Sequence, residues 1–133
     1  MFNYNSYFQA MTDLDEKMRH VRFIQACVGG EIEKVNLLLD NKNLNVDINF
    51  KDSQGNDGFR WACIYKHENV VQELLIKYDY NLSKRNMNYL NKRNEAMNGE
   101  LDDILKMIET QKLYNLLSKS LKTTSLKSKK NKI

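Results

Sequence analysis

One stretch, residues 52–75, most constrains the fold, because it contains a complete helix-turn-helix unit with turn signals at both joints. In the opening sequence Asp-Ser-Gln-Gly, Asp52 can accept hydrogen bonds from nearby backbone N–H groups and Gly55 permits a positive φ. Asp57 then stands where an N-cap residue is expected, since its carboxylate can bind the free N–H groups of the next turn. After a polar break at 66–68, apolar residues recur at helical spacing and form one stripe on a second helix. The stretch therefore predicts two short antiparallel helices.

The same pattern recurs before and after this unit. Residues 26–39 and, more loosely, residues 96–108 repeat its small residues, a glycine shortly after them and a closing run of apolar residues. The second small position is then Cys27, Cys63 and Ala96, with separations of 36 and 33 residues. A fixed period of this length is typical of solenoids, in which about three stacked units are needed to bury a continuous core.

The residues of the middle unit resemble the ankyrin repeat family. The matching positions are Asp52, Gly55, Ala62, His67, Val70, Val71, Leu74 and Leu75. Gly58 and Arg60 stand where the family has a proline and a histidine, so this unit is expected to be less stable than a consensus repeat. The resemblance implies an all-α ankyrin solenoid of about three degenerate units, at about 21–49, 50–82 and 83–109, with capping helices at both ends.

Ankyrin stacks generally bind proteins along a concave groove made by the hairpin tips and one side of the first helices, and the resemblance implies that use here. From their places in each unit, the expected groove residues are Gln25, Trp61, Ile64, Tyr65 and Asn94. The hairpin tip is expected to add Lys51, Ser53 and Gln54, whereas Phe50 should pack between units. Trp61 would lie at the centre, and tryptophan and tyrosine are enriched at binding hot spots. The alternative is that Trp61 packs against its neighbours and binds nothing.

The two ends of the chain are predicted to cover the stack. Residues 1–20 form an N-terminal capping segment and the start of the first helix. Residues 110–122 form a C-terminal capping helix that lies against the third unit, because Leu113, Leu116, Leu117 and Leu121 continue at helical spacing. Residues 123–133 contain few apolar side chains and are predicted to be disordered.

Positive charge is concentrated at the C-terminus. The net charge is +4, yet after Glu109 the chain has seven lysines and no acidic residue, so the rest of the chain is mildly acidic. The last cluster is Lys127, Lys129, Lys130 and Lys132. This basic tail suggests an alternative function, a charge-driven contact with nucleic acid or an anionic membrane, and it leaves nuclear import open. A solvated tail without a partner is the simpler interpretation.

Several classes of function are disfavoured by the sequence. Cys27 and Cys63 fall at the same repeat position and are expected to be buried free thiols of a reducing compartment. With His20 and His67 they form no zinc-binding spacing, and neither a catalytic triad nor a phosphate loop is present. We expect a non-enzymatic monomer without metal or cofactor that binds an unidentified protein.

Neither a signal peptide nor a transmembrane run is found in the sequence, which predicts an intracellular, cytoplasmic protein. The absence of proline and the many asparagines and lysines fit an AT-rich genome, such as that of a large DNA virus or an intracellular microbe. In either case the protein would act in a host cell.

Overall fold

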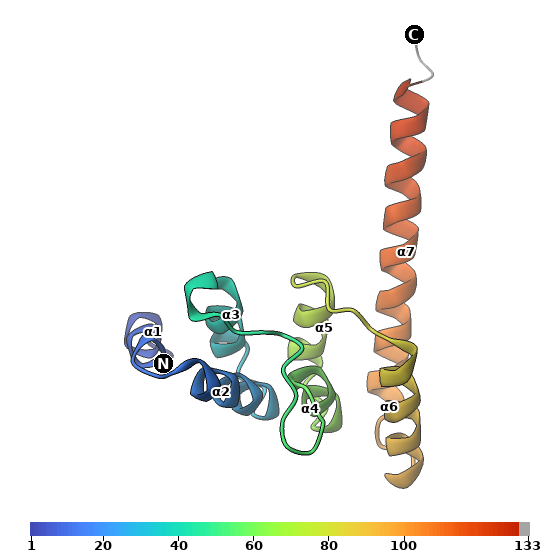
Figure 1. The fold of residues 1–133 in the computed structure, drawn as a ribbon. Coiled ribbons are helices and arrows are strands. Elements are labelled where there is room, and N and C mark those ends of the chain that lie inside the picture. The colour runs from blue at the N-terminus through green and yellow to red at the C-terminus, as the bar shows by residue number, and fades with distance from the viewer. Residues whose placement is uncertain (131–133) are drawn as a thin grey trace.

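The computed structural model describes the backbone of residues 1–130 and the side chains of residues 1–122. Over these residues every element of regular secondary structure is a helix and there is no strand (Figure 1), which confirms the predicted all-α class. The helices are α1 (Tyr4–Thr12), α2 (Glu16–Val28), α3 (Ile32–Asp40), the short 3-10 helix η1 (Lys42–Leu44), α4 (Gly58–Ile64), α5 (Glu68–Ile76), α6 (Lys84–Ala96) and α7 (Asp102–Lys130).

Short polar side chains begin several of these helices. The carboxylate of Asp57 accepts a hydrogen bond from the backbone N–H of Arg60 at 2.9 Å, so the predicted cap of α4 is confirmed. Helix α2 is capped by Asp15, which accepts from the N–H of Met18 at 2.8 Å. Thr12 and Asp13, which precede this cap, close the end of α1.

Three helical hairpins share one type of turn. Gly30, Lys66 and Asn98 lie at the same place in the turns after α2, α4 and α6, each with a positive φ, and they are 36 and then 32 residues apart. In each turn the N–H of this residue donates to the carbonyl three residues earlier. The third unit is therefore shifted by one residue from the predicted register. Its left-handed position is Asn98, and Ala96 is exposed instead of packed.

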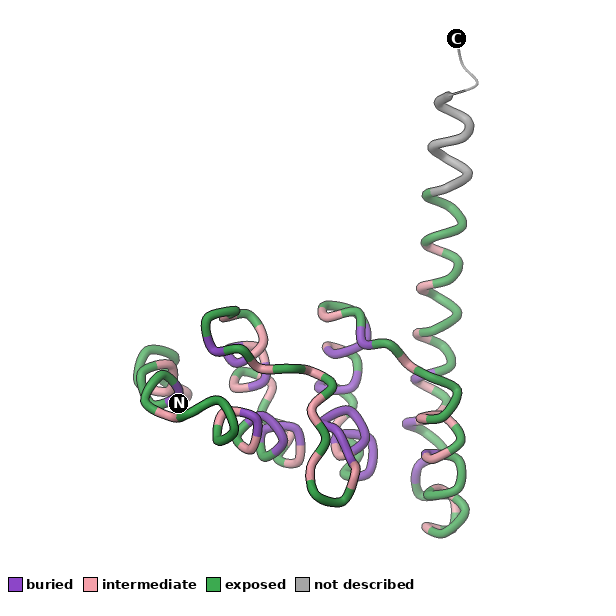
Figure 2. The backbone as a smooth tube through the Cα atoms, in the orientation of Figure 1, coloured by how far each residue is buried: buried purple, intermediate pink, exposed green. Residues whose placement is uncertain are grey.

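The hairpins stack in two layers. Helices α2, α4 and α6 pack side by side, α3, α5 and α7 form the second layer, and α1 covers α3 at the N-terminal end (Figure 1). The core runs between the layers and contains fully buried side chains from every hairpin, among them Phe23, Phe59, Leu74, Leu90 and Ile108. Figure 2 shows this buried band passing through α2, α4, α5 and the start of α7.

Gly58 allows α2 and α4 to approach closely. A Cβ atom at this position would lie 2.7 Å from Sγ of Cys27 and 3.1 Å from Cε1 of Phe23. The glycine that departs from the repeat pattern is thus required by its neighbours. Cys27 and Cys63 are buried free thiols, as predicted, and burial raises the pKa of both.

Arg60, the second departure from the repeat pattern, joins α4 to α6. Its Nε and Nη2 donate to Oδ1 of Asn86 at 3.0 and 2.7 Å, and its guanidinium lies 4.1 Å from the ring centroid of Tyr89. Asn86 also donates to the hydroxyl of Tyr80 at 2.6 Å, and that hydroxyl donates to the carboxylate of Asp57. These buried polar groups therefore bind one another across two hairpins.

A second polar network joins α3 to α5 and the residues after it. The hydroxyl oxygen of Tyr78 lies 2.7 Å from both Asp40 Oδ1 and Asn36 Oδ1, so its single proton is shared between these two acceptors. Lys77 forms an ion pair with Asp40 at 3.1 Å. Asn36 in turn donates to Glu73 at 2.8 Å. Burial, followed by the hydrogen bond to Asp40, raises the pKa of Tyr78 above its usual range.

The C-terminal segment differs from the prediction. Helix α7 is one continuous helix through Lys130, so no separate capping helix begins at residue 110 and the backbone of 123–130 is helical. Its second half extends beyond the stack and leaves Leu113, Leu117 and Leu121 exposed (Figures 1 and 2). No glycine or proline interrupts the chain between Asp102 and Lys130, so nothing turns the helix back. The predicted disorder of residues 131–133 lies outside the described residues.

Candidate protein-binding surface

Asp52 organises the hairpin tip between the first two hairpins. Its Oδ1 accepts from the backbone N–H groups of Gln54 and Asn56, both at 3.0 Å, and Gly55 takes the left-handed conformation that the turn requires. The other carboxylate oxygen accepts from Nε1 of Trp61 at 2.6 Å. One aspartate therefore fixes both the loop and the orientation of the indole ring on α4.

Trp61 belongs to a row of rings along one side of α4. Its ring centroid lies 6.0 Å from that of Tyr65, and the Tyr65 ring lies 6.5 Å from His67. Tyr65 is 52% exposed and Trp61 is half-buried. Because its N–H is bonded to Asp52, the half-buried indole loses little freedom on binding.

His67 anchors the end of this row to the preceding hairpin. Its Nε2 lies 2.7 Å from the carbonyl oxygen of Val28, which can only accept, so this nitrogen carries the proton. A Cβ atom at Gly30 would lie 2.5 Å from the imidazole, so the ring fills the space that the glycine leaves. His67 therefore binds the backbone of the neighbouring hairpin and joins the first two hairpins.

A hollow of about 500 Å³ lies between α2 and the hairpin tip. Its lining is largely apolar, with Val21, Ile24 and Phe50. Charged side chains at its edge are Lys17, Lys51 and Asp52, and the carboxylate of Asp52 is already bonded to the tip and to Trp61. Phe50 is half-buried and stacks on His20, with ring centroids 4.6 Å apart. His20 is itself fixed, because its Nε2 accepts from the N–H of Asp47 at 2.8 Å. The hollow therefore has a supported wall and can receive a small apolar side chain.

The structure brings part of the predicted set together. Gln25, Lys51 and Ser53 line the hollow. Gln54 is exposed at the tip, and Tyr65 is exposed on α4. These residues and Trp61, with the hollow, are called the Trp61 surface below.

Two predicted residues do not belong to this surface. Ile64 is only 7% exposed, because it points into the stack from the last turn of α4. Asn94 binds the start of α7, with Nδ2 donating to Asp102 at 2.7 Å and Oδ1 accepting from the N–H of Leu101 at 2.7 Å. Its amide is thus fully used within the third hairpin, in agreement with the shifted register of that hairpin.

Three residues of the hollow were not predicted from the sequence, namely Lys17, Val21 and Ile24. Lys17, Val21 and Gln25 are spaced by four residues on α2 and so lie along one side of the helix. The spacing was available in the sequence. The groove prediction did not include Lys17, Val21 or Ile24, because it was derived only from positions next to the pair of small residues in each unit.

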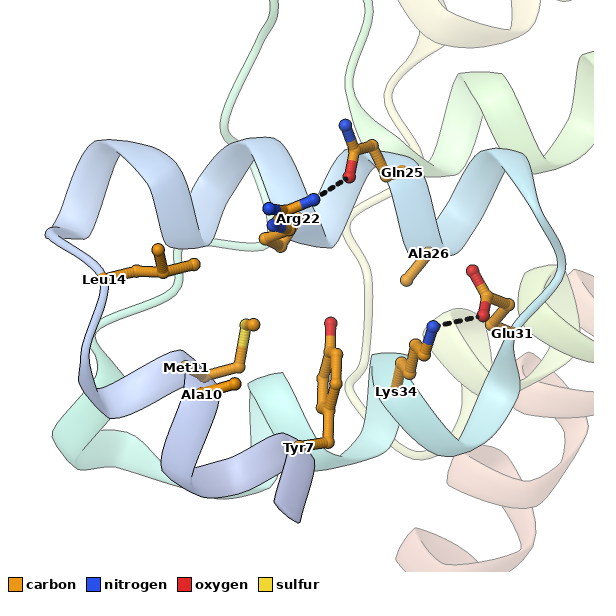
Figure 3. Close-up of a pocket in the computed structure, with 9 residues that line it drawn as sticks. All are labelled: Tyr7, Ala10, Met11, Leu14, Arg22, Gln25, Ala26, Glu31 and Lys34. Atoms are coloured by element: carbon orange, nitrogen blue, oxygen red, sulfur yellow. Dashed lines mark hydrogen bonds and ion pairs between the residues drawn. The ribbon is translucent and has the colours of Figure 1, made fainter. Parts of the chain in front are cut away.

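A second hollow, of about 310 Å³, lies between α1 and the first hairpin (Figure 3). The Tyr7 ring and Met11 face it from α1, and Arg22 and Lys34 reach it from α2 and α3 (Figure 3). Two of its polar pairs are closed on themselves, Lys34 with Glu31 at 2.6 Å and Arg22 with Gln25 at 3.0 Å. The Lys34 charge on its wall is therefore already paired with Glu31, whereas Arg22 is hydrogen-bonded to a neutral amide.

The basic tail cannot be placed as a surface. The side chains of Lys127, Lys129 and Lys130 and the whole of Lys132 lie outside the described residues. Within the part of the chain that is described, no three histidine, cysteine or acidic side chains gather in a metal-binding arrangement. None of the helices there has the length and apolar content that crossing a bilayer requires.

No family model matches the chain, and neither a curated protein nor a solved structure matches it. The case for a function therefore rests on the residues of the Trp61 surface and on the stacking of the hairpins.

Proposed function

We propose that this chain is a short ankyrin-type stack of three divergent units that binds a partner protein and catalyses no reaction. Two observations support the assignment. Three hairpins have the same left-handed turn residue, at Gly30, Lys66 and Asn98. Their helices also form the two layers that a stack of such units requires.

The Trp61 surface is the proposed binding site, and the observation that carries the proposal is the fixed aromatic pair beside an apolar hollow. Trp61 and Tyr65 are large side chains held in place before any partner arrives, by Asp52 and by each other. Aromatic side chains of this kind dominate binding energies because they bury much area at little entropic cost. Nothing within the stack covers Tyr65, whose ring is half exposed.

The lining of the hollow specifies the chemistry of the partner. An apolar side chain of the partner would fill the space bounded by Val21, Ile24 and Phe50. Lys17 and Lys51 at the rim favour an acidic residue next to that side chain, through attraction that also orients the approach. The proposed partner segment is therefore apolar at one position and acidic beside it.

The experiment is affinity capture from a membrane-cleared lysate with quantification of bound proteins by mass spectrometry. The test variants are Tyr65→Ala and Gln25→Ala, and the matched control is Tyr114→Ala. Tyr114 is exposed on α7 to 65%, comparable to Tyr65 at 52%, but belongs to a different surface. A partner of the Trp61 surface should be retained by the control and reduced about tenfold or more by Tyr65→Ala.

Folding of each variant is checked by circular dichroism before capture. Capture that is equally strong for wild type and both test variants would show that the Trp61 surface is not the binding site. Loss of the same protein from Tyr114→Ala alone would place binding on α7 instead.

A further inference from the structure

The two halves of α7 present their apolar residues on opposite sides. In the first half Ile104, Leu105 and Ile108 face the stack, two of them fully buried. Residues seven positions apart lie on the same side of a helix, about two turns on. Seven residues after these three, the chain has Gln111, Lys112 and Asn115, which are all polar.

In the second half of α7 the leucines lie on the side of the helix that carries charged residues in the first half. Leu113 follows Lys106 by seven residues, so the two share one side of the helix, and Leu117 and Leu121 continue it at intervals of four. Leu117 is 55% and Leu121 70% exposed. Because this side points away from α5 and α6, no small movement of the helix could bury the leucines on the stack.

The stack-facing side of the same segment carries polar residues and one leucine, Leu116. Lys112, Asn115 and Lys119 border a hollow of about 410 Å³ between α7 and the loop after α5, together with Leu116. The second half of α7 therefore combines an apolar side, directed outward, with a lysine-bearing side. Helices with these features lie in the interface of a bilayer, with the leucines among the acyl chains and the lysines near the headgroups.

The charge of the segment selects an anionic surface. From Lys112 to the C-terminus the sequence has seven lysines and no acidic residue. A basic cluster on an amphipathic helix binds anionic lipid with about 1 kcal/mol per lysine near the surface. A short apolar side alone gives weak attachment, and a second, electrostatic contribution makes it stable.

We propose that the second half of α7, from Leu113 onward, docks the protein on an anionic lipid surface, with Leu113, Leu117 and Leu121 inserted among the acyl chains. The geometry leaves these leucines open, because the second half of α7 extends beyond the hairpins (Figure 1) and all three side chains are exposed. Docking there leaves the Trp61 surface, on α2 and α4, free to bind a protein partner at the same time.

Other occupants fit less well. The described leucines span fewer than three helical turns, whereas a self-associating coiled coil needs about three to four heptads of apolar residues. Two copies of the segment would also bring like charges together. Nucleic acid would neutralise the lysines but offers nothing to an outward row of leucines.

The test is sedimentation of the full chain with phosphatidylcholine vesicles, with and without phosphatidylserine at about one part in four. The variants are Leu117→Gln/Leu121→Gln and Lys112→Gln/Lys122→Gln. The matched control is Ile76→Gln on α5, whose side chain is 57% exposed, like that of Leu117. Circular dichroism confirms that each variant is folded.

Wild type and control are expected to bind only the vesicles that contain phosphatidylserine, less at high salt, and the leucine variant to bind at least tenfold more weakly. The lysine variant should also bind more weakly. Absence of wild-type binding, or equal binding by the leucine variant, overturns the proposal. Light scattering on the same variants tests self-association. If the wild type is a dimer that does not bind vesicles, and the leucine variant is a monomer, the proposal is overturned, and the leucines instead contact a second copy of the chain.

Discussion

The close approach of α2 and α4 at Gly58 predicts a specific pair of coupled substitutions. In Gly58→Ala, the new Cβ would lie 2.7 Å from Sγ of Cys27 and 3.1 Å from the ring of Phe23, both fully buried. Neither neighbour can move into solvent, so the two helices must separate or the side chains must leave their preferred rotamers. Overpacking of this kind costs about 1–3 kcal/mol.

The net loss is smaller than the strain alone. Replacement of glycine by alanine in a helix restores up to about 1 kcal/mol, less in the first turn, where Gly58 lies. We therefore expect Gly58→Ala to lower the free energy of unfolding by about 1–2 kcal/mol. Cys27→Ala alone removes a buried sulfur and costs about 1 kcal/mol through the void it leaves. In the double variant the new methyl group occupies part of that void, so the total should fall short of the sum by about 1 kcal/mol or more.

Urea unfolding followed by far-ultraviolet circular dichroism measures these free energies for wild type, both single variants and the double variant. The matched control pairs Gly58→Ala with Cys63→Ala, since Cys63 is an equally buried cysteine five residues further along α4. That pair should be additive. Additivity of Gly58→Ala with Cys27→Ala to within about 0.5 kcal/mol would refute the argument that the sulfur limits the approach of the helices.

Three further substitutions test the turns and the polar networks. Lys66→Gly should raise the free energy of unfolding by about 0.5–1 kcal/mol, because Lys66 has a φ of 60°, a conformation that is unfavourable for residues with a Cβ atom but not for glycine. A lower urea midpoint would contradict this. Asn86→Ala should lower it by about 2–3 kcal/mol, since the buried groups of Arg60 and Tyr80 lose a partner; a loss below about 0.5 kcal/mol in urea unfolding would show that water replaces the amide. Burial, with hydrogen bonds to carboxylates, raises the pKa of Tyr78 and Tyr80 in the folded state. The folded chain therefore holds more protons than the unfolded chain above about pH 10, and stability should fall as the pH rises through that value. Urea midpoints between about pH 8 and 11 should fall less steeply for Tyr78→Phe/Tyr80→Phe, and equal slopes would contradict the assignment.

The middle hairpin could be predicted because its signals are local. Asp52, Gly55 and Asp57 act on backbone groups within four residues, so the tip and the N-cap follow from residue type and spacing alone. The all-helical class followed from the periodic apolar residues. The apolar hollow beside the tip needed contact between α2 and residue 50, which no local pattern specifies.

The third hairpin was misplaced by one residue for a physical reason. The predicted register placed Gly99 at the position of Gly30, whereas the structure places Asn98, the first left-handed residue of the turn, at that position. Asparagine adopts this conformation more easily than most residues, so the turn needs no glycine there. The shift moved Asn94 from a supposed groove position to the end of α6, where it binds α7.

The C-terminal error has a different cause. Helical spacing of the leucines was recognised, but their side of the helix was not compared with that of Ile104 and Ile108. The prediction of a helix through Leu113 and Leu117 was correct, but the prediction that these leucines pack against the stack was wrong. The spacing of apolar residues identifies a segment as a helix. Which side of the helix is buried depends on how those residues align with the ones already packed in the core.

The departures from the repeat pattern fall into two groups, and the difference between them bears on function. Gly58 and Arg60 break local rules, but each is compensated inside the stack, by the close approach of Cys27 in one case and by hydrogen bonds to Asn86 in the other. The exposed rings and leucines receive no such compensation, because Tyr65 and Leu121 leave most of their apolar surface in water. Uncompensated apolar exposure that a fold holds in a fixed orientation points to a contact outside the chain. Since these two surfaces lie on different helices, one contact can be removed by substitution without the other, which makes the two proposals independent.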